Sequence, residues 1–147
     1  MRFSLRAIVI IGLSCLVLIN PVSASICGHQ KAGVSVVMKN GKKIRIDIPP
    51  EKLESTPKWI SVDSELPLGI NKASEIGLTW ARNKYNEYDD LRIVLISLSG
   101  FDCWGRNGYW YYKITFAPIK NGREYRTASE YMVVVLMDGS IIEPISE

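Results

Sequence analysis

The chain has 147 residues, a hydrophobic content of 47% and a formal net charge of +3. This length is sufficient for one domain with a hydrophobic core. The small positive charge argues against a nucleic-acid-binding protein, because such proteins carry a concentrated basic surface.

Residues 1–24 have the features of a secretory signal peptide. Two arginines precede an uncharged apolar run from Ala7 to Ile19, and Val22-Ser23-Ala24 supplies the small residues of a cleavage site. We predict cleavage after Ala24, which places the mature protein in the periplasm or outside the cell, without stable membrane insertion. The apolar run is shorter than the roughly 20 residues that span a bilayer. A retained membrane anchor is therefore the second interpretation.

Two of the three cysteines, Cys27 and Cys103, remain after removal of the signal. In an exported chain they are most simply joined in a disulfide. His29 lies close to Cys27, but a catalytic cysteine–histidine pair would need a free thiolate and a third, orienting group. One histidine and two distant cysteines also match no ligand spacing for zinc. We therefore expect a protein that is not an enzyme and that holds no metal or cofactor.

Residues 25–65 are predicted to contain an N-terminal β-hairpin and a proline-containing connector. Apolar residues alternate with polar or small ones on both sides of Asn40-Gly41. The loop is either a two-residue turn at Asn40-Gly41 or a three-residue loop that begins at Lys39. The three-residue loop pairs Val36 with Ile44 and keeps the apolar side chains on one face, so we prefer it.

The connector from Glu51 to Leu68 shows no sustained periodicity. It contains two prolines, which interrupt regular structure. We expect Trp59 and Ile60 to pack against the domain.

Residues 66–147 are predicted to form a second unit of one helix followed by antiparallel strands. Asn71 is a suitable N-cap, and apolar residues then recur at helical spacing until about Asn86. Strands are expected at 91–98, 109–116 and 131–137, with a turn at Asp138-Gly139 and a short edge from 141. The continuous apolar run of the strand at 131–137 indicates burial on both faces.

The strand from Tyr109 to Phe116 is the predicted centre of the sheet. A period of two places its side chains on two faces: Trp110, Tyr112, Ile114 and Phe116 on one, and Tyr109, Tyr111, Lys113 and Thr115 on the other. The first face is apolar and is expected to lie against the helix. Exposed tyrosines are typical of recognition surfaces, so the candidate binding surface is Tyr109, Tyr111 and Lys113. The alternative is that the hairpin or the connector covers these residues.

Four features of this part of the chain carry a resemblance to a known family. They are a leucine-initiated helix from Leu68 through Trp80, the strand Ile93–Leu98, the group Trp110-Tyr111-Tyr112 with Phe116, and the closing segment Val133–Gly139. Together they resemble the PepSY-like domains of exported bacterial proteins, over roughly residues 66–144. The N-terminal hairpin and the cysteine pair are not part of that pattern.

The resemblance implies an α+β fold in which one main helix packs on a small antiparallel sheet, PepSY- or cystatin-like, here preceded by the hairpin. It also implies a noncatalytic module of the kind associated with regulation or inhibition of secreted peptidases. We therefore expect an exported protein-binding module. The alternative is a periplasmic inhibitor or immunity-type partner of a secreted hydrolase, such as a peptidase or cell-wall enzyme.

Overall fold

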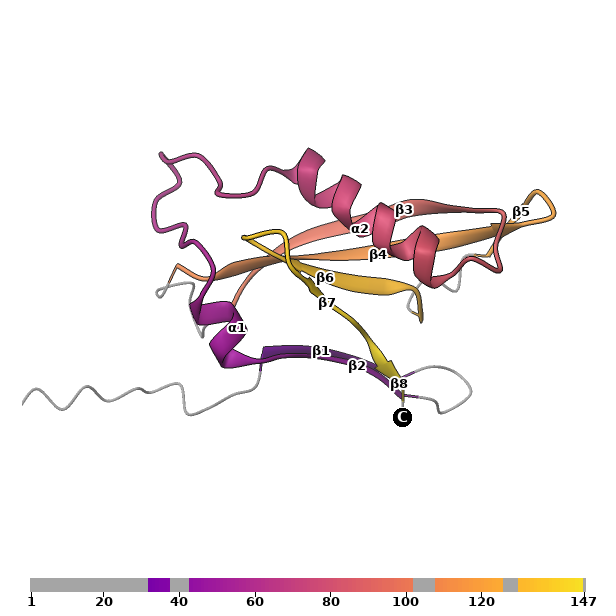
Figure 1. The fold of residues 1–147 in the computed structure, drawn as a ribbon, viewed down its shortest axis with the longest axis horizontal. Helices are drawn as coiled ribbons and strands as arrows, with labels where there is room; N and C mark the ends of the chain where they lie inside the picture. Colours follow the sequence, from indigo (N-terminus) through magenta and orange to yellow (C-terminus); the bar gives the residue numbers. More distant parts are fainter. Residues whose placement is uncertain (1–31, 38–42, 102–107, 126–129, 147) are drawn as a thin grey trace, which may run out of the picture.

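The computed structural model describes residues 32–37, 43–101, 108–125 and 130–146. Its main sheet has the strand order β3-β4-β6-β7, and β5 pairs with β4 beside this path; every pairing is antiparallel. The strands are β3 (Asp90–Gly100), β4 (Trp110–Lys120), β5 (Arg123–Glu124), β6 (Met132–Leu136) and β7 (Ile141–Ile142). Helix α2 (Ile70–Lys84) lies along one face of this sheet (Figure 1). The prediction of an α+β fold with one main helix on an antiparallel sheet is confirmed.

Helix α2 begins one residue before the predicted cap. Its N-cap is Gly69, in an extended conformation and without a side-chain capping bond, so the prediction of Asn71 as N-cap is wrong. The helix buries a stripe of small residues, Ala73, Gly77 and Ala81, which allows a close approach to the sheet. A Cβ atom at Gly77 would lie 2.8 Å from Cδ1 of Ile114 on β4.

Both faces of the main sheet are buried at its centre, along β4 and β6. Strand β6 places Val133 and Val135 in the apolar cluster below α2, and its other residues, Met132, Val134 and Leu136, in a second cluster on the opposite face. Strand β4 alternates in the same way. Tyr112, Ile114 and Phe116 lie in the helix-side cluster, and Trp110 packs against it. The period of two predicted for β4 and the two-sided burial predicted for β6 are confirmed.

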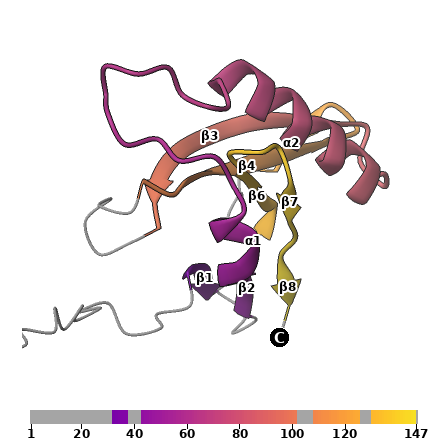
Figure 2. The same cartoon turned by 60° about the vertical axis from the view of Figure 1, so that its left-hand side comes forward.

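The second face of the main sheet faces a smaller sheet with the order β1-β2-β8. Its strands are β1 (Ala32–Val37), β2 (Lys43–Ile48) and β8 (Ile145–Ser146), and the short helix α1 (Pro50–Glu54) follows β2. Figures 1 and 2 show this small sheet and α2 on opposite sides of the main sheet. The isoleucines of β2 share the second apolar cluster with Leu53 of α1 and with residues of β4, β6 and β7.

Strands β1 and β2 pair antiparallel, with Val36 opposite Ile44 and Val34 opposite Ile46. These pairs agree with the register preferred from the sequence. The connecting residues, 38–42, lie outside the described residues, and the hairpin loop therefore stays a prediction. The segment 1–24, His29 and the cysteine pair also lie outside the described residues. Within the described ranges, no helix has the length and apolar character needed to cross a membrane.

Candidate functional site

The three residues of the predicted binding surface have different surroundings. Tyr111 is only 8% exposed and belongs to the apolar cluster that contains Ile44 and Leu53. Burial raises the pKa of its phenol, and a hydrogen bond with Ser99 opposes that shift. Lys113 and Tyr109 are half-buried. For Tyr111 the alternative interpretation therefore holds: residues of β2 and α1 cover this face of β4, and Tyr111 is not exposed.

Tyr109 lies just before β4 and contacts the connector and α1. Its hydroxyl donates a hydrogen bond to the carbonyl of Glu54, at 3.4 Å. The Nζ atom of Lys58 lies 4.6 Å from the centre of the Tyr109 ring, a cation–π distance. Of the three residues of the predicted surface, Tyr109 thus lies beside the segment that joins α1 to α2.

That segment extends away from the body of the protein as a wide loop (Figure 2). Trp59 fixes it to the sheet. The backbone N–H of Trp59 donates to the carbonyl of Gly108 at 2.8 Å, and the indole Nε1 of Trp110 donates to the carbonyl of Trp59 at 3.0 Å. The two indole rings meet edge to face, with centroids 5.2 Å apart. The predicted packing of Trp59 against the domain is confirmed.

The tip of the loop is a hydrogen-bonded turn. The backbone N–H and the hydroxyl of Ser64 both donate to the carbonyl of Ser61, at 3.1 and 2.6 Å, and the hydroxyl of Ser61 accepts from the N–H of Asp63. The indole Nε1 of Trp59 donates to the carbonyl of Ser64 at 2.9 Å. The Ser64 end of the tip is therefore tied to Trp59, which lies two residues before Ser61. We call residues Lys58–Ser64 the tryptophan-braced loop.

The tryptophan-braced loop presents two large apolar side chains to solvent. Ile60 is 80% exposed and Val62 is 83% exposed, so the expected packing of Ile60 is wrong for most of its surface. Cγ1 of Ile60 lies close to Gly108, whose φ of +72° favours glycine and where a Cβ would lie 2.9 Å from that atom. Aliphatic side chains held in water on an ordered backbone are suited to fill an apolar depression on another protein.

A second grouping of aromatic residues lies at the C-terminal end of α2. Tyr131, before β6, meets the rings of Tyr85 and Tyr88 edge to face, at 5.1 and 5.5 Å between centroids. The hydroxyls of Tyr88 and Tyr131 are 2.5 Å apart. An open cavity here is lined by Ile44, Lys84, Tyr85, Glu87, Glu130, Tyr131 and Pro144. These ring contacts join α2 to the start of β6, so this grouping has a stabilising role.

The tyrosine grouping predicts a loss of stability at alkaline pH. Burial, and then the negative charges of Glu143 and Glu87, raise the pKa of Tyr85 from 10.0 to about 12. Burial, followed by the bond to Tyr88, also raises the pKa of Tyr131. Because the folded-state pKa is raised, the stabilisation is complete below pH 10 and is lost as the pH rises toward 12. Urea midpoints measured across this range should fall, and Tyr85→Phe should make the fall shallower. A fall of equal steepness in Tyr85→Phe would contradict this assignment.

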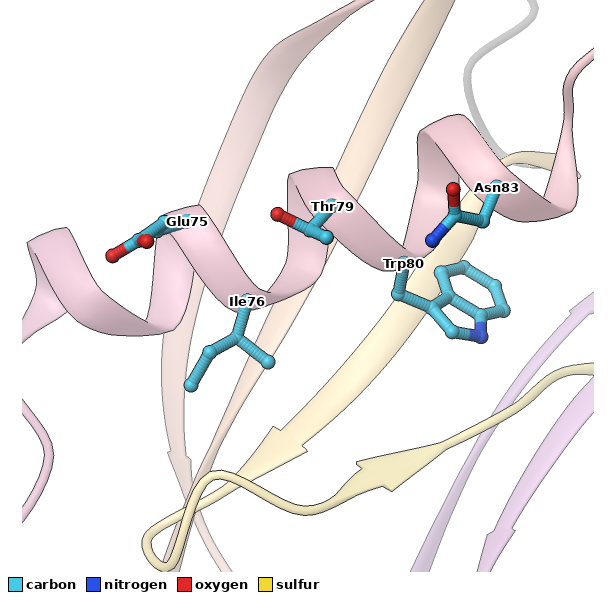
Figure 3. A pocket seen from close by; sticks show the side chains of 5 residues that line it. All are labelled: Glu75, Ile76, Thr79, Trp80 and Asn83. Carbon is cyan, nitrogen blue, oxygen red and sulfur yellow. The ribbon is translucent and has the colours of Figure 1, made fainter.

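A third location is a shallow hollow along α2, shown in Figure 3 and lined by Glu75, Ile76, Thr79, Trp80 and Asn83. All of its lining residues come from one helix. Glu75 already pairs with Lys72 at 2.9 Å, and the Trp80 indole N–H donates to Glu143 at 3.3 Å. The hollow lacks the convergent polar groups of a small-molecule site.

Among the described residues, no three histidine, cysteine or acidic side chains are grouped as a metal site would require. The tryptophan-braced loop is therefore the strongest candidate for a functional site. Sequence reasoning missed it because the connector lacks periodicity, and only its Trp59 gave a signal. Comparisons of the chain with protein-family models, with curated proteins and with solved structures find no match.

Proposed function

We propose that the protein is an exported, noncatalytic binding module with a PepSY-like arrangement, which contacts a protein partner through the tryptophan-braced loop. The proposal includes cleavage of the signal after Ala24, a location in the periplasm or outside the cell, and a disulfide between Cys27 and Cys103. It requires no metal or cofactor. The helix-on-sheet architecture is consistent with the PepSY-like arrangement.

The observation that carries the proposal is the exposure of Ile60 and Val62 on a hydrogen-bonded loop. Exposed apolar residues are unremarkable when they are scattered singly. These two lie two positions apart, and the backbone between them is held by the bonds of Trp59 and Ser64. A preordered loop loses little conformational entropy when it binds, and this favours recognition by contact with a partner.

The proposal predicts that the double variant Ile60→Ser, Val62→Ser binds its partner at least about tenfold more weakly, the effect expected for loss of apolar anchors. Its urea midpoint should stay near that of the wild type, because both side chains are exposed. The measurement is crosslinking and recovery of the partner from the cell envelope, followed by titration with the purified partner. Ile70→Ser is the matched control, since Ile70 is exposed outside the loop. Equal binding by the double variant and the wild type would rule out the loop as the contact.

The form of the loop also favours the second function, inhibition of a secreted hydrolase. A protruding segment with a fixed backbone and two aliphatic tips is able to enter the cleft of an enzyme. The purified partner distinguishes the two functions. An inhibitor reduces hydrolysis by its partner at equimolar amounts, whereas a binding module leaves the rate unchanged.

A further inference from the structure

Strand β3 has one edge that no strand of the described residues pairs with. It is the end strand in the order β3-β4-β6-β7, and within the described part of the chain no strand pairs with its outer side. It is also one of the longest strands, from Asp90 to Gly100. A free edge of this length offers a row of backbone donors and acceptors to another strand.

The edge has few of the features that usually prevent such pairing. From Ile93 to Gly100 it contains no charged residue and no proline. Its irregularity is a bulge between Ile93 and Leu95, where Val94 is 42% and Leu95 is 52% exposed. Beyond the bulge, the six residues from Leu95 to Gly100 pair with β4 in a regular register.

The direction of the backbone groups follows from one hydrogen bond. The N–H of Phe101 donates to the carbonyl of Tyr109 at 2.9 Å. Bonded and non-bonded pairs alternate in an antiparallel ladder. Ser99 and Ser97 therefore direct their backbone groups toward β4, whereas Leu98 and Ile96 direct theirs outward.

We propose that two copies of this chain form a dimer through β3, paired antiparallel about a two-fold axis at Ser97. This register brings the outward-directed groups of Ile96 opposite those of Leu98 from the partner copy. It sets Leu95 opposite the small Ser99, and Ser97 opposite its own equivalent. The two main sheets then form one continuous sheet with both α2 helices on the same face.

The second copy is the occupant that the edge favours, because the pairing segment is uncharged and self-complementary. The charges of β3, on Asp90 and Arg92, lie outside the paired segment and already bind Arg82 and Glu124. An acidic or basic partner strand would find no opposite charge between Ile93 and Gly100. This surface is distinct from the tryptophan-braced loop, so either proposal is able to fail without the other.

The test uses protein produced from the full chain and measures its mass by sedimentation across a range of concentrations. We expect a concentration-dependent dimer. In Ser97→Cys, a mild oxidant should give a disulfide-linked dimer, because opposed residues in a non-bonded pair have Cα atoms about 4.5 Å apart, within disulfide range. Ser99→Cys is the matched control on the same face. In the dimer Ser99 lies opposite Leu95, so the new thiols of the two copies would lie several residues apart. Ser99→Cys should therefore stay unlinked.

Ser97→Glu tests the interface in a second way. In the monomer the new carboxylate faces Lys113, the β4 residue paired with Ser97, so folding should be preserved. In the dimer two glutamates lie opposite each other, and like charges there should weaken dimerisation about fivefold or more. A monomer mass at every concentration would overturn the proposal. Equal crosslinking of Ser97→Cys and Ser99→Cys would do the same.

Discussion

Tyr111→Ala is expected to lower the free energy of unfolding by about 3–5 kcal/mol, the range for truncation of a buried aromatic side chain. Tyr111 is 8% exposed and packs in the cluster formed with β2, α1 and β6. Removal of its ring would leave a cavity between the two sheets, because strands on both sides hold the lining residues in place. Urea unfolding monitored by circular dichroism measures the change.

Two further variants measure separately how much stability comes from the Tyr111 hydroxyl and how much a tyrosine ring contributes at a neighbouring position of the same face. Tyr111→Phe keeps the ring and removes the hydroxyl that bonds with Ser99, so it should cost about 0.5–1.5 kcal/mol. Tyr109→Ala removes a half-buried ring that belongs to the same face and should cost less than Tyr111→Ala. If Tyr111→Ala costs no more than Tyr109→Ala, the small sheet does not cover this face in solution.

The parts of the fold that sequence could predict are those set by local periodicity. The period of two in β4 and the continuous apolar run of β6 identify which side chains are buried. The turn at Asp138-Gly139 is predictable because glycine readily adopts the positive φ that such a turn needs. In the structure, Gly139 has a φ of +85°. The predicted N-cap of α2, Asn71, lies two residues after the observed one, because Gly69 lacks a capping side chain and gives no signal.

The burial of Tyr111 was not predictable from alternation alone. Alternation divides side chains between two faces, but it does not identify the segment that covers each face. The cover is β2, which precedes β4 by more than sixty residues in the sequence. The alternating isoleucines of β2 and the second face of β4 each required an apolar partner, and the structure places the two in one cluster.

The candidate site was missed for a related reason. The exposure of Ile60 depends on where Trp59 is held, and Trp59 is held by Gly108 and Trp110, about fifty residues later. No pattern within the connector records those contacts. The free edge of β3 likewise depends on strand order, which the sequence of β3 does not specify.

Ile46→Ala should lower the free energy of unfolding by about 2–5 kcal/mol. Ile46 is fully buried at the centre of β2, in the cluster that joins the small sheet to the main sheet. Lys43→Ala is the matched control, because Lys43 occupies the alternate, half-exposed face of the same strand. It should change the stability by less than about 0.5 kcal/mol.

The urea unfolding of Ile46→Ala also tests whether the two sheets unfold together. If β2 and β6 share one core, the two sheets unfold together, and tryptophan fluorescence and far-ultraviolet circular dichroism give the same urea midpoint. All tryptophans of the described residues, Trp59, Trp80 and Trp110, lie on α2, its preceding connector or β4. In a Trp104→Phe background, which removes the one tryptophan outside the described residues, the fluorescence therefore reports on the main sheet and not on the small one. Two separate midpoints would mean that the small sheet unfolds first, and that residues 25–65 form a unit of their own stability. Coincident midpoints shifted by the same amount would mean that a cavity under β2 weakens the helix-covered face as well.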